Sequence, residues 1–384
     1  MKLNYDYIIC GGGASGLSLA FELSKDHAFK SKKILIIDPE YPKNINDRTW
    51  CFWEKNDNEK WENSIFHKWE NILFKGDNFK KNISLNPLSY KMLKSKSFYD
   101  YVNTTIKRNP NIDSVNEKVI ECKDHGNFCK VKTESNVYET KKVFNSILQW
   151  DNINNHKKYP LLIQHFEGWF IKTKKDFFNP NEATFMDFTI DQNSNTKFIY
   201  TLPFSKNEAL IEYTLFSKNV LSKKSYEKFL ISYLNKIGIN DYSLISKESG
   251  KIPMTGYPFH KHNSKNILHI GSAGGWSKPS TGYTFKNIER NTKRLLNFLK
   301  SESDLRIFHK TTRFRYYDII FLDVLFNNNH LGKKLFTEMF KNNKPKIIFK
   351  FLDEKSNVFE ELRIMSNFSI GIFIKTIVKR FLKL

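Results

Sequence analysis

The sequence predicts an α/β fold in which a nucleotide-binding domain is interrupted by a mostly antiparallel β domain and followed by a helical C-terminal region. Three observations lead to this prediction. A glycine-rich turn joins an apolar strand to an apolar helix near the N-terminus, and a second glycine-rich segment follows another apolar strand at residues 267–270. Between them, residues 160–262 alternate apolar and polar side chains and carry turn signals, as expected for antiparallel strands.

The first glycine turn has the spacing of a dinucleotide-binding motif. Gly11, Gly13 and Gly16 occupy the three glycine positions of G-x-G-x-x-G. One glycine permits the turn, one lets the backbone approach a pyrophosphate, and one lets the helix pack closely on the strand. The helix that begins at Ala14 and Ser15 would direct its unpaired N–H groups and its positive dipole end at the phosphates.

A second short apolar run ends at Asp38, whose carboxylate can accept hydrogen bonds from an adenosine ribose. Strand, glycine turn, helix, strand and acid therefore follow in order, and they indicate a Rossmann-like domain that binds FAD. In the later glycine segment, Gly271, Thr281 and Gly282 precede a helix-like pattern, where backbone N–H groups would face the negative edge of a flavin. This arrangement favours a reduced, anionic flavin, and an ordinary glycine loop is the alternative.

The composition limits the classes of function. At 384 residues the chain is long enough for two domains with a large core, and its formal net charge is +22. Only nine of the basic residues are Arg and Lys is spread along the whole chain, which indicates a compositional bias and argues against nucleic acid as a partner. The four cysteines contain no C-x-x-C pair and no signal segment precedes the first strand, so we expect a reduced, cytoplasmic setting with no metal site.

The C-terminal stretch has the pattern of a basic amphipathic helix. No apolar run is long enough to span a bilayer. Lysines lie on one side of the helical wheel, and the other side carries Ile370, Phe373, Ile374, Ile377, Val378, Phe381 and Leu384. This face either lies on the inner surface of the cell membrane or packs on the core of the protein, and an anionic leaflet would match the positive charge.

The domain boundaries follow from these patterns. We expect a discontinuous FAD-binding domain at residues 1–150 and 265–304, and a substrate-binding β domain at residues 151–264. Residues 305–384 are predicted to form a helical region with an amphipathic, membrane-facing tail.

One carboxylate in the β domain is placed for acid–base chemistry. Residues 198–216 read as a hairpin, and Glu212 shares a strand face with Leu210 and Thr214 because side chains alternate with period two. Burial among apolar neighbours would raise the pKa of Glu212 and make it an acid or base near neutral pH. A solvated face with an exposed Glu212 is the alternative.

Short segments spread over nearly the whole chain match one family in combination. They are Asp6 to Gly16, Asn46 to Trp53, Met186 to Phe188, Leu210 to Thr214, Ile252 to Met254, Lys278 to Phe285 and Leu322 to Leu325. Together they resemble bacterial lycopene beta-cyclase. This resemblance implies a flavoprotein fold with a substrate domain inserted in the nucleotide domain, reduced FAD as the active cofactor, NADPH as the reductant, and a carotenoid dissolved in the membrane as the substrate.

The reaction that the resemblance implies is a cyclisation without net redox change, the work of an intramolecular lyase or isomerase. A proton added to the terminal double bond of lycopene leaves a tertiary carbocation, which the neighbouring double bond attacks to close a six-membered ring. Loss of a ring proton gives a beta-ionone ring. Two such closures lead through gamma-carotene to beta-carotene, in carotenoid biosynthesis.

The resemblance also assigns roles to single residues. The catalytic glutamate of the family falls on Glu212, whereas Tyr213 stands where plant members have a second acid. Asp187 is a second catalytic candidate, with a turn or cap role as its alternative, and Arg48 could contact the cofactor or form a surface ion pair. Ser272 stands where many redox flavoproteins have an acid for the ribityl chain.

Aromatic side chains in and near these segments could stabilise the carbocation by cation–π interaction, with core packing as the alternative role. They are Trp50, Trp53, Phe204 and Trp276. Two rival functions remain compatible with the same sequence. One is a redox enzyme on the same fold, such as an aromatic hydroxylase or a prenyl-chain reductase, and the other is a carotenoid-binding protein without activity.

Overall fold

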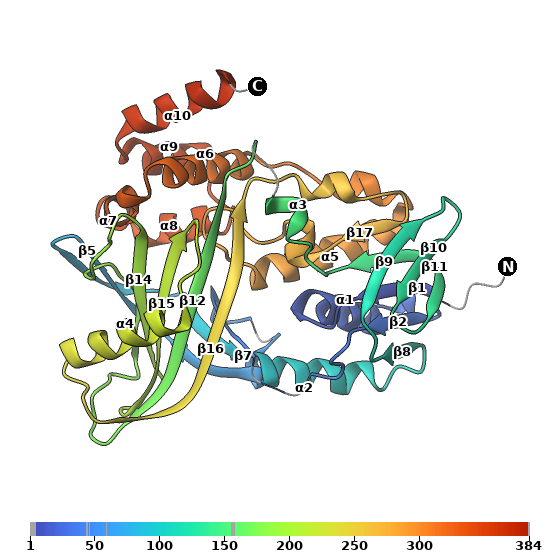
Figure 1. Ribbon diagram of the computed structural model, residues 1–384, viewed down its shortest axis with the longest axis horizontal. Coiled ribbons are helices and arrows are strands. Elements are labelled where there is room, and N and C mark those ends of the chain that lie inside the picture. The colour runs from blue at the N-terminus through green and yellow to red at the C-terminus, as the bar shows by residue number, and fades with distance from the viewer. Residues whose placement is uncertain (1–4, 44, 46, 59, 155–157, 383–384) are drawn as a thin grey trace. The chain divides into compact units, whose positions relative to one another are not determined.

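The chain forms two compact units, and each is assembled from three separate segments (Figure 1). The computed structural model describes residues 5–43, 45, 47–58, 60–154 and 158–382. Unit 1 comprises the described parts of residues 1–47, 94–159 and 256–312. Unit 2 comprises the described parts of residues 48–93, 160–255 and 313–384.

Unit 1 is built on a sheet whose central strands are parallel. The strand order is β8-β2-β1-β11-β10-β9, and β17 pairs with β11. The parallel strands are β1 (Tyr5–Cys10), β2 (Ile34–Ile37), β8 (Ile112–Val115), β11 (Val137–Asn145) and β17 (Ile267–His269). Strands β9 (Val119–Asp124) and β10 (Cys129–Thr133) complete an antiparallel meander with β11. Because β2 is buried along its whole length, it reads as an unbroken apolar run.

Helices of unit 1 pack on this sheet and on one another. Helix α1 (Ala14–Lys25) contacts α2 (Ser95–Ile106) and α5 (Phe285–Ser301), and α3 (Asp151–Asn154) is a single short turn. The predicted order of strand, glycine turn, helix and strand is therefore present, and the predicted α/β class is confirmed. Short 3-10 turns occur at His27–Phe29, Phe259–His262, Gly271–Gly274 and Leu305–Phe308.

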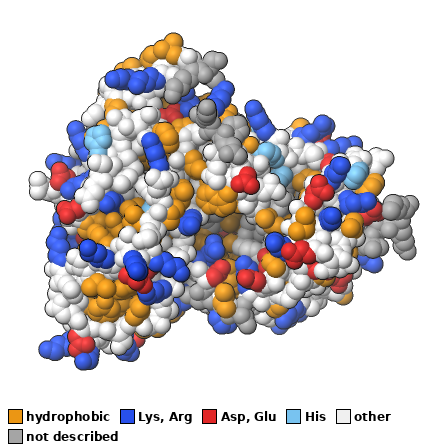
Figure 2. All heavy atoms as spheres, viewed as in Figure 1, with side chains coloured by type: hydrophobic (Ala, Val, Ile, Leu, Met, Phe, Trp, Pro, Cys, Tyr) orange, Lys and Arg blue, Asp and Glu red, His pale blue; other side chains and the backbone are white. Residues whose placement is uncertain are grey.

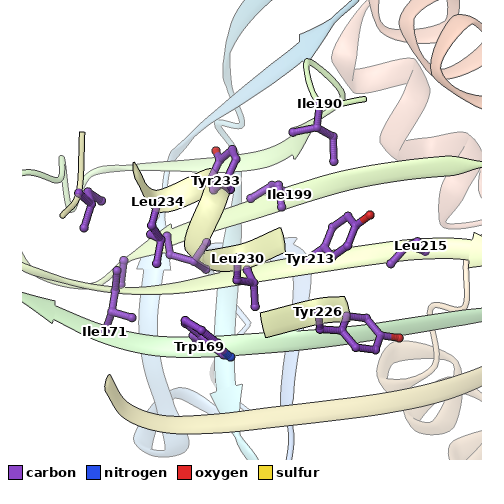
Figure 3. Close-up of a cluster of buried hydrophobic side chains, with 13 residues drawn as sticks. Trp169, Ile171, Ile190, Ile199, Tyr213, Leu215, Tyr226, Leu230, Tyr233 and Leu234 are labelled. Carbon is purple, nitrogen blue, oxygen red and sulfur yellow. The ribbon is translucent and has the colours of Figure 1, made fainter. Parts of the chain in front are cut away.

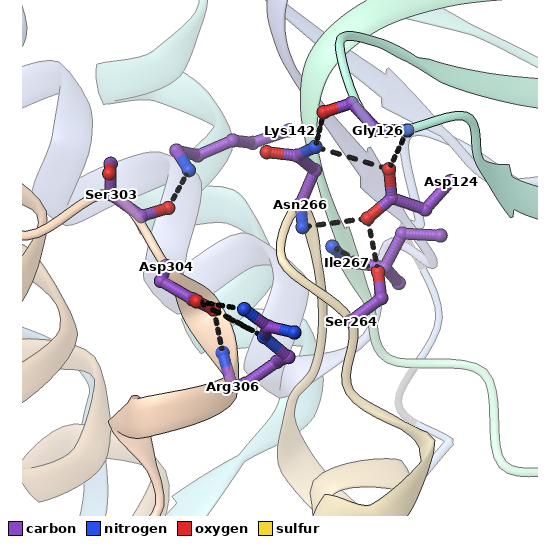
Figure 4. A network of polar contacts seen from close by, with 9 residues as sticks. All are labelled: Asp124, Gly126, Lys142, Ser264, Asn266, Ile267, Ser303, Asp304 and Arg306. Atoms are coloured by element: carbon purple, nitrogen blue, oxygen red, sulfur yellow. Dashed lines mark hydrogen bonds and ion pairs between the residues drawn. The ribbon is translucent and has the colours of Figure 1, made fainter.

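A polar network fastens the third segment of unit 1 to the meander (Figure 4). The carboxylate of Asp124 accepts hydrogen bonds from Ser264 Oγ at 2.5 Å and from the backbone N of Asn266 at 2.9 Å. The side-chain amide of Asn266 donates to the carbonyl oxygen of Gly126 at 2.8 Å. These bonds place the chain so that β17 can enter the sheet beside β11.

Unit 2 is built on a long, mostly antiparallel sheet with the order β16-β12-β15-β14-β13-β5-β6. Its strands are β16 (Tyr242–Thr255), β12 (Leu161–Thr173), β15 (Glu208–Ser217), β14 (Thr196–Pro203), β13 (Glu182–Asp187), β5 (Asn71–Gly76) and β6 (Phe79–Ser84). Only β13 and β5 pair in parallel among these described strands. A second sheet has the order β3-β7-β4, formed by β3 (Thr49–Lys55), β7 (Leu88–Lys94) and β4 (Ile65–Trp69), with a 3-10 turn at Glu62–Ser64.

The boundaries of the units differ from those expected from the sequence. Residues 48–93 were expected in the FAD-binding domain, but they belong to unit 2 because β5 pairs with β13. Residues 305–312 belong to unit 1, whereas the helices after Thr312 pack within unit 2. Both differences arise from contacts between residues far apart in the chain, which local patterns do not record.

One face of the long sheet is covered by α4 (Lys223–Lys236), a helix that the strand-like reading of residues 160–262 missed (Figure 3). From the helix, Tyr226, Leu230, Tyr233 and Leu234 are buried against a sheet layer that includes Trp169, Ile171, Ile199, Ile211, Tyr213 and Leu215. The side chain of Ser222 caps the helix by accepting a hydrogen bond from Ser225 N at 3.3 Å. This face of the sheet is therefore a packed core.

The C-terminal region of unit 2 is helical, as expected from the sequence. Its helices are α6 (Arg313–Asn327), α7 (Gly332–Asn342), α8 (Pro345–Leu352), α9 (Val358–Ser366) and α10 (Ile370–Leu382), with a 3-10 turn at Asn329–Leu331. Helix α7 packs on β5 and β14, where Phe340 stacks on Phe74 and Phe336 stacks on Phe188. Among the helices of the described residues, none is long and apolar enough to cross a bilayer.

Candidate functional site

The first glycine turn of unit 1 is shaped by the absence of side chains. Gly11 has a φ of +98°, a backbone conformation that residues with a Cβ rarely adopt. A Cβ on Gly16 would collide with the carbonyl oxygen of Gly11. Gly13 is the N-cap of α1 and makes no side-chain capping bond, and a Cβ there would meet no atom within 4 Å. The N-terminal end of α1 therefore opens onto free space, as a phosphate-binding turn requires.

Asp38 lies against this turn at the end of β2. Its Oδ2 accepts a hydrogen bond from Gly12 N at 2.6 Å, and its Oδ1 accepts one from Glu40 N at 2.9 Å. The side chain is buried, and a Cβ on Gly12 would lie only 3.1 Å from that of Asp38. The backbone thus holds the carboxylate beside the place where the sequence predicts a ribose.

The second glycine segment meets the first within unit 1. Gly271 has a φ of +60°, and a Cβ on it would lie 2.7 Å from the Cβ of Ser15. The buried hydroxyl oxygens of Ser15 and Thr281 have no hydrogen-bond partner among the described residues. Gly282 also has a positive φ, +70°, and its N–H donates to the carbonyl oxygen of Lys278 at 2.8 Å.

These features fit a bound dinucleotide. Buried hydroxyl groups without partners are rare in folded proteins, and phosphate or flavin acceptors would satisfy them. An open helix N-terminus, a carboxylate beside the glycine turn and two glycine segments in contact supply the remaining parts of such a site. Arg48 is exposed and is the first residue of unit 2, so its predicted contact with a cofactor stays a prediction.

The two glycine segments, 11–16 and 271–282, together form a glycine cradle for the cofactor. Its assignment can be tested with a matched control. Gly13→Ala adds a methyl group where the protein itself has room and where φ is −84°, so the fold should tolerate it. The methyl group would occupy space that a pyrophosphate needs, and FAD affinity should fall at least about tenfold, or about 1.4 kcal/mol. Visible absorbance of bound flavin measures the affinity, and thermal melting of the flavin-free protein measures the stability.

Gly371→Ala is the control, because a Cβ at Gly371 in α10 also meets nothing within 4 Å. It should leave flavin binding unchanged. Equal flavin affinity of the Gly13→Ala variant and the parent protein would contradict the assignment of the cradle.

Glu212 lies on the face of the long sheet opposite α4. Its neighbours Ile211 and Tyr213 point into the core beneath that helix, so the alternation along β15 turns Glu212 to the other side. The side chain is half-buried, and Thr214 Oγ1 donates a hydrogen bond to its Oε1 at 2.7 Å.

Burial and a neighbouring charge alter the acidity of this group. Desolvation, followed by the negative charge of Glu248, raises the pKa of Glu212 from 4.5 to about 8, and the hydrogen bond from Thr214 opposes the rise. The carboxyl group therefore holds its proton at neutral pH and can donate it. This is the direction expected from the apolar neighbours in the sequence.

Asp187, the second catalytic candidate, has different surroundings. It is buried, its Oδ2 lies 3.1 Å from Lys75 Nζ, and its Oδ1 accepts hydrogen bonds from the backbone N and the hydroxyl of Thr189 at 2.9 and 2.6 Å. It stands opposite Ile199, which belongs to the core layer beneath α4. Asp187 thus points away from the Glu212 face, and its contacts are those of a turn and an ion pair. Its catalytic role stays a prediction.

The aromatic candidates divide between the units. In unit 2, Trp53 is buried against Phe185 and Phe349, and Phe204 contacts Phe66 and Phe170. Trp50 is half-buried. In unit 1, Trp276 is buried near Phe308. Packing roles are therefore evident for three of them, and the cation–π role stays a prediction.

Sequence reasoning missed one acidic residue of this face, Glu248. It is buried on β16, and its Oε2 accepts a hydrogen bond from Thr49 Oγ1 at 2.7 Å. In the sequence Glu248 stands among polar residues, which gave no sign of burial. Among the described residues there is no cluster of His, Cys, Asp or Glu that could hold a metal ion.

Comparison with known proteins identifies the family. A sequence model described as lycopene cyclase protein matches residues 6–376. The chain belongs to the lycopene cyclase family. It is 26% identical over 303 residues to a capsanthin/capsorubin synthase of Citrus sinensis and 25% identical over 306 residues to a neoxanthin synthase of Solanum lycopersicum. Each match covers 73% of this chain but only 57% and 58% of the relative, so the chain spans a little over half the length of these relatives.

Solved structures with a similar fold include flavoproteins. A geranylgeranyl bacteriochlorophyll reductase-like protein from Thermoplasma acidophilum has a TM-score of 0.59 at 14% identity, covering 98% of this chain and 96% of that one. The halogenase PltM has a TM-score of 0.62 at 12% identity, covering 97% of this chain and 85% of that one. Another PltM structure holds phloroglucinol and FAD. At these identities the likeness establishes the fold alone.

The raised pKa of Glu212 makes a prediction that needs no activity assay. Because the folded-state value of about 8 lies above the ordinary 4.5, the cost of ionisation is absent below about pH 4.5 and complete above about pH 8. Glu212→Gln cannot ionise, so it should gain stability over the parent protein through this window. The gain should reach on the order of 2 kcal/mol at high pH, after allowance for solvent around a half-buried group. Thermal melting against pH measures it.

Glu227→Gln is the matched control, because Glu227 lies in a surface ion pair with Lys247 at 2.6 Å. It should show no such gain. A Glu212→Gln effect that is equal at low and high pH would contradict the assigned burial of the charge.

Proposed function

We propose that this protein is a lycopene beta-cyclase that uses reduced FAD to convert the linear ends of lycopene to beta-ionone rings without net redox change. The observation that carries the proposal is Glu212, a carboxylic acid that keeps its proton at neutral pH on a desolvated sheet face. Family membership supports carotenoid cyclisation, and the glycine cradle of unit 1 supports the flavin.

The chain's own residues account for the acid–base steps. The protonated carboxyl of Glu212 donates to the terminal double bond of the substrate, and a tertiary carbocation forms. The neighbouring double bond attacks this carbon, a carbon–carbon bond closes the ring, and the positive charge moves within the new ring. Loss of a ring proton to a carboxylate restores the acid, so atoms and electrons balance without an oxidant.

Surroundings of Glu212 serve this chemistry in two ways. The hydrogen bond from Thr214 Oγ1 fixes the position of the carboxyl group. Tyr200 pairs with Glu212 across the sheet and packs edge-on to Phe185, so a π-rich surface lies beside the acid. The glycine cradle would hold FAD, which in its reduced form supplies negative charge that favours a carbocation, and NADPH would supply the electrons that reduce it.

The decisive test is product identity. Expression of the chain in lycopene-accumulating cells should yield beta-carotene, with gamma-carotene as the one-ring intermediate. Glu212→Gln should lower ring formation by at least about a hundredfold, which is the contribution typical of a general acid. Chromatography with mass measurement identifies the pigments, and the surface variant Glu227→Gln should act like the parent protein.

The rival functions give different results in the same test. Cyclisation leaves the mass of the substrate unchanged, whereas a hydroxylase or reductase changes it. A carotenoid-binding protein without activity would leave lycopene unconverted, and Glu212→Gln would retain its binding.

We also propose that α10 holds the protein on the inner face of the cell membrane, where the substrate is dissolved. Along this helix Ile370, Ile374, Val378 and Phe381 are at least half exposed, at 54, 54, 50 and 72%. They follow at helical spacing, so they form one apolar stripe, and Figure 2 shows apolar and basic side chains together at the upper end of the molecule, over α10. Leu384, predicted on the same face, lies outside the described residues.

Other residues of α10 anchor it within unit 2. Arg380 Nη1 donates a hydrogen bond to Asp323 Oδ2 of α6 at 2.5 Å, and Phe373 stacks on Phe368. The helix is thus held on α6 by one side while its apolar stripe faces outward, with Lys375 and Lys379 exposed beside it. A cytoplasmic location at the membrane surface follows from this proposal, with no nucleic acid involved.

Vesicle sedimentation tests the membrane proposal. The double variant Ile374→Ser and Phe381→Ser should reduce binding to anionic phospholipid vesicles about tenfold, because two apolar side chains no longer enter the interface. Ile120→Ser is the control, since Ile120 is 51% exposed on β9 of unit 1. Binding that is unaffected by the double variant, or equal on neutral and anionic vesicles, would contradict a role for the basic apolar helix.

A further inference from the structure

Four strands of unit 2 place four residues in one row across the sheet. Gly168 on β12 stands opposite Glu212 of β15 on one side and opposite Glu248 of β16 on the other. Tyr200 on β14 continues the row beyond Glu212. Since directly paired residues point to the same face, both carboxyl groups lie on the side away from α4.

Gly168 has no side chain to separate the two acids, and its neighbours close over it. A Cβ on Gly168 would lie 2.8 Å from Leu210 Cδ1, 3.3 Å from Glu248 Cγ and 3.5 Å from Glu212 Cβ, so both acidic side chains approach this backbone position beside Leu210. Any larger residue would separate them. The two strands that carry the acids are about 10 Å apart, and long glutamate side chains can approach one another across that span because the residue between them has no side chain of its own.

The second sheet of unit 2 supplies further contacts to the pair. Thr49 on β3 donates a hydrogen bond to Glu248 at 2.7 Å, as Thr214 does to Glu212 at the same distance. Burial, followed by the negative charges of Glu212 and Glu248, raises the pKa of the Cys51 thiol well above its usual value. Cys51 follows Thr49 by two residues on β3, so a single strand face lies over both acids.

We propose that Glu212 and Glu248 form a carboxyl pair that shares one proton, with Glu248 as the positioning residue that keeps this proton on Glu212 until the substrate takes it. This inference rests on the proposed cyclisation and adds a residue to it. Two nearby carboxylates in a desolvated place cannot both ionise at little cost, so the ionised Glu248 holds its partner in the acid form. When the proton moves to carbon, the pair carries two negative charges toward the cation, and the ring proton later returns to it.

Other ionisable groups lie beside the pair or on a helix that packs on its strands, and they belong in its charge balance. Tyr200 and Cys51 lie beside it, and Tyr90 of β7 is hydrogen-bonded to Cys51. Helix α6, which packs on β12 and β16, carries Asp318 and Asp323, and Arg380 neutralises Asp323. None of these residues is substituted in the test below, so their contributions to the stability of each variant cancel in the comparison.

A double-mutant cycle measured by thermal melting tests the pair without an activity assay. Glu212→Gln, Glu248→Gln and the double variant are compared at about pH 5 and about pH 9, on either side of the shared proton. At high pH each single substitution relieves the same repulsion between the two carboxylates. The rise in melting temperature of the double variant should therefore fall short of the sum of the two single rises by about 2 °C or more. At low pH the gains should add. Additivity at both values, or a shortfall that does not depend on pH, would overturn the proposal.

The pH profile of cyclisation supplies the second measurement. Activity needs protonated Glu212 and is lost as pH rises through its pKa. Removal of the Glu248 charge lowers that pKa, so the alkaline limb of kcat/KM for Glu248→Gln should move to lower pH by about one unit. For Glu227→Gln the alkaline limb should not move. If the limb of Glu248→Gln also does not move, Glu248 has a structural role only and the proposal is wrong. If the parent protein makes no cyclic carotene, the proposed function fails, while the melting cycle still decides the carboxyl pair.

Discussion

Removal of one carboxyl group from water is the constraint on which the proposed chemistry of this protein depends. A glutamate in solution is ionised at neutral pH and cannot protonate an alkene. The pKa of Glu212 is raised because β15 turns it to a desolvated face, near the charge of Glu248, while its sequence neighbours fill the core beneath α4. The core beneath α4 thus determines which face carries Glu212, and burial on that face raises its pKa.

In unit 1, the absence of side chains at glycine positions has a comparable importance. Gly16 allows α1 to approach the carbonyl of Gly11, and Gly271 allows the later segment to lie against Ser15. The same feature recurs in unit 2, where Gly168 lets Leu210 and two acids approach the backbone between the acids. In each case a missing side chain, and not an added one, creates the place where chemistry is proposed.

Local patterns were sufficient for much of the fold. The nucleotide-binding unit was predictable because its strand, turn and helix lie next to one another in the chain and each has a distinct apolar period. Alternation along a single strand also predicted that Glu212 shares a face with Leu210 and Thr214, but it left open whether that face is buried or solvated, and the catalytic assignment came from the family resemblance. The helical C-terminal region also follows from periodicity alone.

Three features were not predicted from the sequence: helix α4, the assignment of residues 48–93 and the burial of Glu248. The first had a local pattern that was overlooked, and the other two depend on contacts between distant residues. Tyr226, Leu230, Tyr233 and Leu234 have helical spacing, so α4 left a signal that the reading of a continuous sheet obscured. The assignment of residues 48–93 needed the pairing of β5 with β13, more than a hundred residues away. Glu248 became visible only through its register with Gly168, which no local pattern encodes.

The interleaved order of the segments constrains how the chain is made. Strand β17 and helix α5, which complete unit 1, come after nearly the whole long sheet of unit 2 has been synthesised. Unit 2 in turn is completed only by α6 to α10, which follow the segments of unit 1 in the chain. The core that contains Leu35 and Ile37 of β2 is therefore completed only when Ile267 of β17 has been made, and apolar surface exposed until then is a site at which a nascent chain can aggregate.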